Sequence, residues 1–136
     1  NLGRSEDQKM ARNFQELIDV VASDPSQRIT HDDVMRLAKA IGLTEFYNSA
    51  GLEVAQRFHN GSLSYAIGDA IMNDLWNLAL DDLDDLDAQQ LPEPFYQIYE
   101  TFDAGEYRRT SNKAEDPVAD FTKPMITEIL QKSQSL

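Results

Sequence analysis

Five aspartates within seven consecutive positions form the densest group of residues that could do chemistry in this 136-residue chain. They are Asp81, Asp82, Asp84, Asp85 and Asp87, and no basic residue lies near them in the sequence. Carboxylates grouped in this way can bind a divalent cation, attract a basic partner or keep a helix end in water. No motif in the sequence identifies a reaction, so the function predicted for the chain depends on which of these three possibilities holds.

Metal binding has little support. The aspartate run lacks the DxDxDG pattern of a calcium-binding loop. Residues 22–33 and 56–67 resemble such loops superficially, but Ala22 would occupy the first ligand position of one, and Phe58 and Ile67 the third and last positions of the other. Neither stretch supplies enough oxygen ligands. The sequence therefore predicts no metal site, and nothing in it indicates a cofactor.

Catalytic signatures are also missing. The two histidines, His31 and His59, show neither HExxH nor Glu-x-x-His spacing, and the chain has no cysteine. No GxSxG elbow, Walker loop or GxGxxG motif occurs. Each histidine is expected to be a surface or capping residue, and the chain is predicted not to be an enzyme.

The charge layout is the most informative feature. Net charge is −12, and eleven acids but no Lys or Arg lie between Arg57 and Arg108. Such a field repels phosphate and anionic lipid and attracts a basic protein surface. No run of 18 apolar residues occurs, and no charged start leads into an apolar stretch. We therefore expect a cytoplasmic protein with a basic protein partner, and neither nucleic acid nor membrane as a partner.

Two interpretations of the aspartate run stay open. Negative charge at the end of a helix opposes the helix dipole by about 0.3–1 kcal/mol per residue, so the run is not there to stabilise its own helix. It is either a solvated helix end that gives solubility or a docking patch for cationic side chains. In the second case, the predicted partner-binding residues are Asp74, Asp81, Asp82, Asp84, Asp85, Asp87, Glu93 and Tyr96.

Apolar residues recur every three or four positions, which predicts an all-α chain: one domain over residues 1–136, folded as an orthogonal or irregular bundle of five to seven helices. Expected helices end near Ala22 and start after Thr30 and after Thr44. Thr30 can cap its helix, and Asp33 lies at the third helical position, where a carboxylate favours the helix start. Asp116 with Pro117 is expected to form a cap and first turn. Residues 64–80 are the best candidate for a central helix. Another helix is expected to follow Pro94, and the last helix is expected to contain Pro124 in its first turn. Gly42 and Gly105 are typical helix stops, Gly105 in a left-handed conformation. Residues 106–116 are expected to form a polar surface loop.

The segment FYQIYETFDAGEYRR, followed by DPVADFTKPMITEIL, resembles the C-terminal part of small acidic bacterial proteins of uncharacterised or toxin-immunity type. The features that carry the resemblance are FDAGEY, residues 102–107, and DPVADFTKP, residues 116–124. It implies a cytosolic helical protein that binds and neutralises a cognate toxin.

Two functional hypotheses follow. The first is a non-enzymatic acidic protein that docks a basic protein partner, with neutralisation of a toxin such as a nuclease as its sharpest version. The second is a regulatory or scaffold domain that binds a partner helix or peptide in an apolar groove, with the acids serving only solubility. It requires an exposed apolar groove of several hundred Å².

Overall fold

The computed structural model describes residues 2–24, 26–107 and 116–134, and within these ranges the chain forms helices and no strand. The α-helices are α1 (Leu2–Ser23), α2 (His31–Ala38), α3 (Leu43–His59), α4 (Tyr65–Asp81), α5 (Phe95–Ala104) and α6 (Lys123–Gln134). Two short 3₁₀ turns, η1 (Leu83–Asp85) and η2 (Asp87–Gln89), join α4 to α5, and a π-helix, η3 (Val118–Thr122), precedes α6. The all-α prediction is confirmed.

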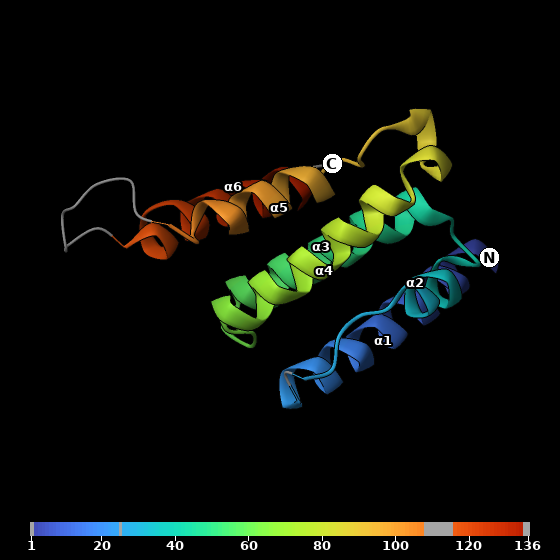
Figure 1. Ribbon diagram of the computed structural model, residues 1–136, viewed down its shortest axis with the longest axis horizontal. Coiled ribbons are helices and arrows are strands. Elements are labelled where there is room, and N and C mark those ends of the chain that lie inside the picture. Colours follow the sequence, from blue (N-terminus) through green and yellow to red (C-terminus); the bar gives the residue numbers. More distant parts are fainter. Residues whose placement is uncertain (1, 25, 108–115, 135–136) are drawn as a thin grey trace.

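The helices lie as three neighbouring pairs, α1 with α2, α3 with α4 and α5 with α6 (Figure 1). The central helix is α3, which packs against α1, α2, α4, α5 and α6. The prediction that residues 64–80 form the central helix was wrong. Small buried residues on α3, Ala50, Gly51 and Ala55, explain its position, because they let neighbouring helices approach closely. A Cβ atom on Gly51 would already lie 3.4 Å from the ring of Phe95 on α5.

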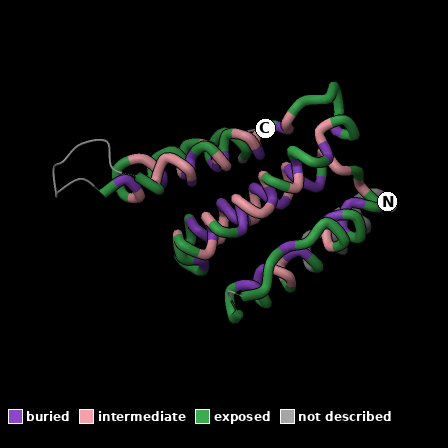
Figure 2. Tube along the Cα trace, in the orientation of Figure 1, coloured by how far each residue is buried: buried purple, intermediate pink, exposed green. Residues whose placement is uncertain are grey.

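The core is a continuous set of aromatic and aliphatic side chains between the pairs. Figure 2 shows the buried residues along the inward faces of the helices and the exposed ones along the outer faces. Phe14 of α1 meets Phe46 of α3 edge to face, with ring centroids 5.9 Å apart. Tyr47 of α3 packs against Phe95 of α5. These rings tie the first, second and third pairs into one core.

A local cap explains where α2 begins. The Thr30 hydroxyl accepts a hydrogen bond from the Asp33 backbone at 3.2 Å, and the Asp33 carboxylate accepts one from the Thr30 backbone at 3.0 Å. This capping box satisfies two donors at the start of α2, as the sequence predicts. The helix ends at Ala38, before the predicted stop at Gly42. Gly42 instead has a φ of +91° and leads directly into α3.

Gly105 ends α5 as predicted, but for a different reason. Its φ is −82°, so the expected left-handed conformation is wrong. A Cβ atom here would lie 2.5 Å from Oγ1 of Thr122 and 2.8 Å from the hydroxyl of Tyr65. Glycine is therefore needed because η3 and α4 approach the end of α5 closely.

The C-terminal segment is held by polar caps. The Asp116 carboxylate accepts hydrogen bonds from the backbone amides of Val118 and Ala119, at 3.2 and 3.3 Å, which confirms Asp116 as a cap. Thr122, buried in η3, donates to the Thr101 carbonyl of α5 at 2.9 Å. Most of the predicted polar loop, residues 108–115, lies outside the described residues.

Candidate functional site

The aspartate run divides where α4 ends. Asp81 is the last residue of α4 and is exposed, whereas Asp82, the C-cap residue, is only 4% exposed. The chain then changes to the 3₁₀ turns η1 and η2, and Leu86 between them is buried against the core. The run is therefore an ordered pair of turns around one buried apolar side chain, and its members do not share one environment.

Asp82 joins three parts of the fold. Its carboxylate accepts a hydrogen bond from Nε2 of His31, at the start of α2, and one from the hydroxyl of Tyr47 on α3, each at 2.8 Å. The hydrogen bond from His31 to Asp82 and the negative charge of Asp82 raise the pKa of His31. Burial, followed by its own hydrogen bond to Asp82, raises the pKa of Tyr47. Because Asp82 is buried and its carboxylate accepts two hydrogen bonds from its own chain, it is not available to a partner. Its prediction as a docking residue has to be corrected.

The other aspartates of the run face solvent. Asp81, Asp84, Asp85 and Asp87 are exposed, and their carboxylates make no ion pair within the described part of the chain. The Asp87 backbone amide donates to Oγ1 of Thr44 at 2.9 Å, which fixes η2 against the start of α3. Figure 1 shows these turns projecting at one end of the molecule. The acidic turn, which comprises residues 81–87 without Asp82, therefore presents four exposed carboxylates on an ordered backbone.

Two acids that are distant in the sequence, Asp32 and Asp74, differ in whether they add charge to this surface. Asp32 in the first turn of α2 is exposed and, like Asp81, acts on the charge of His31, so it belongs beside the acidic turn. Asp74 on α4 is different, because Arg28 forms an ion pair with it and only 10% of its side chain is exposed. Its contact to Nε of Arg28 measures 3.1 Å. Asp74 is therefore already neutralised by its own chain.

Glu93 and Tyr96, the remaining predicted site residues, meet at a shallow hollow. Its volume is about 380 Å³, and it lies between η2 and the start of α5. Leu83 and Leu91 supply apolar walls, Gln89 and Gln90 polar ones. Tyr96 packs against Trp76 of α4, with ring centroids 5.6 Å apart, and Trp76 stacks on Tyr99 at 3.9 Å. No sequence pattern predicts that these leucines form a hollow.

A second acidic cluster lies along the α4–α5 contact. Burial, a hydrogen bond with Glu106 and the negative charges of Glu106 and Asp103 raise the pKa of Asp69 to about 7. Asn73 donates to Asp69 at 3.5 Å and to Glu106 at 3.4 Å. Burial and these three acids also raise the pKa values of the neighbouring Tyr65 and Tyr99. Sequence reasoning missed this cluster, since only helix packing brings residues 69 and 106 together.

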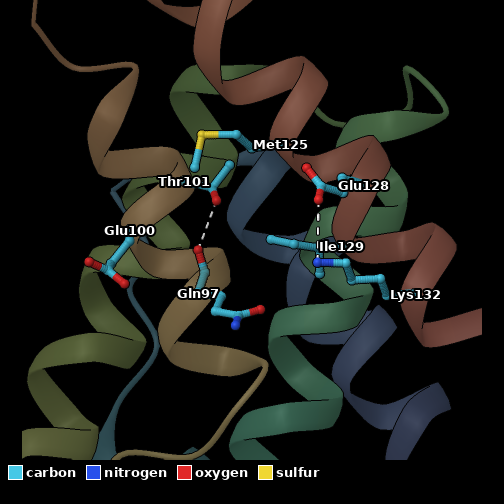
Figure 3. Close-up of a pocket in the computed structure, with 7 residues that line it drawn as sticks. All are labelled: Gln97, Glu100, Thr101, Met125, Glu128, Ile129 and Lys132. Carbon is cyan, nitrogen blue, oxygen red and sulfur yellow. Dashed lines mark hydrogen bonds and ion pairs between the residues drawn. The ribbon is translucent and has the colours of Figure 1, made fainter.

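An apolar groove was the requirement of the second hypothesis. The hollow between α5 and α6 has a volume of about 360 Å³ and is lined partly by Met125 and Ile129 (Figure 3). Charged side chains share its walls, and Lys132 forms an ion pair with Glu128 at 3.3 Å. This hollow therefore offers mixed charge and a small apolar area, which is less than the exposed apolar groove of several hundred Å² that the second hypothesis requires.

Other chemistry finds no assembled site among the described residues. No three acidic or histidine side chains there are placed to hold a metal ion. His59 is exposed, and its Nδ1 lies 3.4 Å from the Thr127 hydroxyl. None of the helices described is both long enough and apolar enough to cross a membrane.

Comparison with known proteins adds no relative. No family model matches the chain, and no curated protein or solved structure is significantly similar to it. The function therefore has to be argued from the acidic turn, the hollow beside it and the charge of the chain.

Proposed function

We propose that this protein is a non-enzymatic acidic binding module that docks a basic surface of another protein through the acidic turn. The observation that carries the proposal is that four exposed aspartates lie at the end of α4 and in the two ordered turns that follow it, without an ion pair to any described residue. An acid placed only for solubility does not need such an anchor, whereas a docking patch gains from fixed charges because less freedom is lost on binding.

Two features favour a basic protein over other cationic ligands. The patch extends over η1, η2 and the first turn of α2, so its charges are spread over a surface instead of converging on one ion. The span of the sequence without Lys or Arg also makes the surroundings negative, which speeds encounter with a positive surface. A nuclease toxin is the sharpest version of the partner, because a protein that holds nucleic acid has to be basic.

The test compares two variants with equal net charge. The patch variant replaces the four exposed aspartates of the acidic turn by Asn. The control variant removes four exposed acids elsewhere, as E16Q, E100Q, D120N and E128Q. Each immobilised chain is exposed to a soluble extract of its source cells at low and at high salt, because the screening length falls from about 10 Å at 0.1 M to about 3 Å at 1 M.

Wild type and control are expected to capture the same basic protein at low salt and to lose it at high salt. The patch variant is expected to lose it at both. Capture that ignores salt, or equal capture by the patch and control variants, would contradict the proposal.

A further inference from the structure

The hollow beside the acidic turn is lined by apolar, aromatic and acidic side chains. Its apolar walls are Leu83 and Leu91, its aromatic wall is Tyr96, and its only charged lining residue is Glu93. Glu93 is exposed, and its carboxylate makes no hydrogen bond or ion pair within the described residues. A hollow with apolar, aromatic and amide side chains around one anion that has no partner among the described residues fits a ligand with an apolar stem and a cationic end.

The size of the hollow limits that ligand. At about 380 Å³ it lies near the lower end of the range of roughly 300–1,000 Å³ typical of ligand pockets. A long side chain fits such a space, while a helix does not. Lysine and arginine both have apolar stems and charged ends, so either matches the walls in outline.

The aromatic wall favours arginine. A guanidinium group is planar, stacks on aromatic rings and can bond a carboxylate with two parallel N–H groups. Tyr96 is held by Trp76, which is itself stacked on Tyr99, so the ring is supported from behind by two further aromatic side chains. Lysine has a compact and strongly hydrated charge and gains less from the ring.

The backbone also shapes this edge. Ala88 and Gln89 both have positive φ values, of 57° and 53°, which is uncommon for residues other than glycine. Gln89 lines the hollow and belongs to η2, which begins at Asp87 of the acidic turn. Charge complementarity thus extends from Glu93 to the neighbouring aspartates.

We infer that the hollow is an anchor site for one arginine side chain of the basic partner, stacked on Tyr96 and paired with Glu93. The inference rests on the proposed function and names its central contact. Interfaces often depend on a few such anchors, with Arg and Tyr prominent among them, surrounded by contacts of smaller effect.

The experiment titrates the protein with a short arginine–alanine peptide and with its lysine twin at low salt. Trp76 is the only tryptophan in the chain and contacts Tyr96, so its fluorescence reports occupation of the hollow. E93Q removes the anion, and E100Q on the following helix, α5, is the matched control because Glu100 is exposed and lies outside this hollow. Y96L removes the ring and keeps an apolar wall.

The arginine peptide is expected to bind about tenfold more tightly than its twin, and E93Q to weaken it about tenfold, the size of a charge-assisted contact. E100Q should change the affinity less than twofold, within what a screened surface charge contributes. Y96L should remove the preference for arginine.

Three other outcomes would contradict the anchor site or the proposed function. If both peptides bind equally and E93Q matches E100Q, the anchor site is wrong while patch-mediated docking stands. If arginine binding persists in E93Q but disappears in the patch variant, the anchor is again wrong. If neither peptide binds the wild type, both the anchor and the proposed function fail.

Discussion

The two acidic regions of α4 handle negative charge in opposite ways. At the C-terminal end, Asp82 is buried but accepts hydrogen bonds from His31 and Tyr47. In the first half of the helix, Asp69 is half-buried and faces other acids, Asp103 and Glu106. In the first region, hydrogen-bond donors surround the carboxylate of Asp82. In the second, the carboxyl group of Asp69 lies beside groups of like charge.

The difference shows that burial alone does not decide the effect of a carboxylate. A buried ionised group stabilises a fold only where donors replace the water it loses. At Asp82 they come from two other helices, so the carboxylate links α2, α3 and the end of α4. At Asp69 the fold favours the protonated form, and an ionised cluster costs stability.

Replacing Asp82 by Ala should have the largest effect on stability of the substitutions that test this comparison. The substitution leaves the Tyr47 hydroxyl buried without its acceptor and removes the partner of His31, so the free energy of unfolding should fall by about 3 kcal/mol. Urea unfolding followed by circular dichroism measures the loss. D81A is the matched control, because Asp81 is exposed at the helix end and its removal should change stability by only a few tenths of a kcal/mol. Similar losses in both variants would show that Asp82 has no special role.

Replacing Asp69 by Asn tests the other side of the comparison. The folded pKa of Asp69, about 7, lies above the unfolded value of 3.8, so the folded state keeps a proton that the unfolded state releases. Stability should therefore fall as the pH rises from 4 to 7 and stay low above 7. D69N removes this loss, and its gain at pH 8 should be about 1 kcal/mol once solvent screening of a half-buried group is counted.

The measurement is urea unfolding of wild type and D69N at pH 5 and pH 8, with E100Q as the control for loss of an exposed charge. Wild type should be less stable at pH 8 than at pH 5, and D69N should show a smaller difference. A wild-type difference that D69N leaves unchanged would mean that Asp69 is ionised in the folded protein at both pH values.

These two regions also mark the limit of what the sequence predicts. Helix existence and most helix starts follow from local patterns, and Thr30 with Asp33 and Asp116 are caps in the structure as the sequence indicates. The roles of His31 and Asp82 depend on contacts between residues 51 positions apart. Helical spacing sets Asp82 apart from the face that Asp81, Asp84 and Asp85 share, but no local pattern predicts that Asp82 is buried.

The π-helix and the central position of α3 were missed for a related reason. Hydrophobic periodicity shows which face of a helix is apolar, but not how many neighbours that face will have. The small residues of α3 permit close packing on several sides, whereas the apolar pattern of residues 64–80 indicates a buried face without showing how many helices contact it. Likewise, Gly105 looked like a conformational stop because its crowding comes from Thr122 and Tyr65, which are distant in sequence.

Replacing His31 by Gln should give the smallest effect and separates the two pH responses. Because Asp82 raises the pKa of His31 above its ordinary value of 6.5, the ion pair stabilises the fold fully below that value and loses its effect as the pH rises through the folded pKa. Gln can donate a hydrogen bond but cannot carry the charge, so H31Q should be less stable than wild type at pH 5 and nearly equal to it at pH 9. H59Q is the control, since His59 contacts a hydroxyl group instead of a carboxylate. D69N acts in the opposite sense, raising stability at high pH. If H31Q lost equal stability at both pH values, the imidazole would contribute only a neutral hydrogen bond, and Asp82 would owe its position mainly to Tyr47.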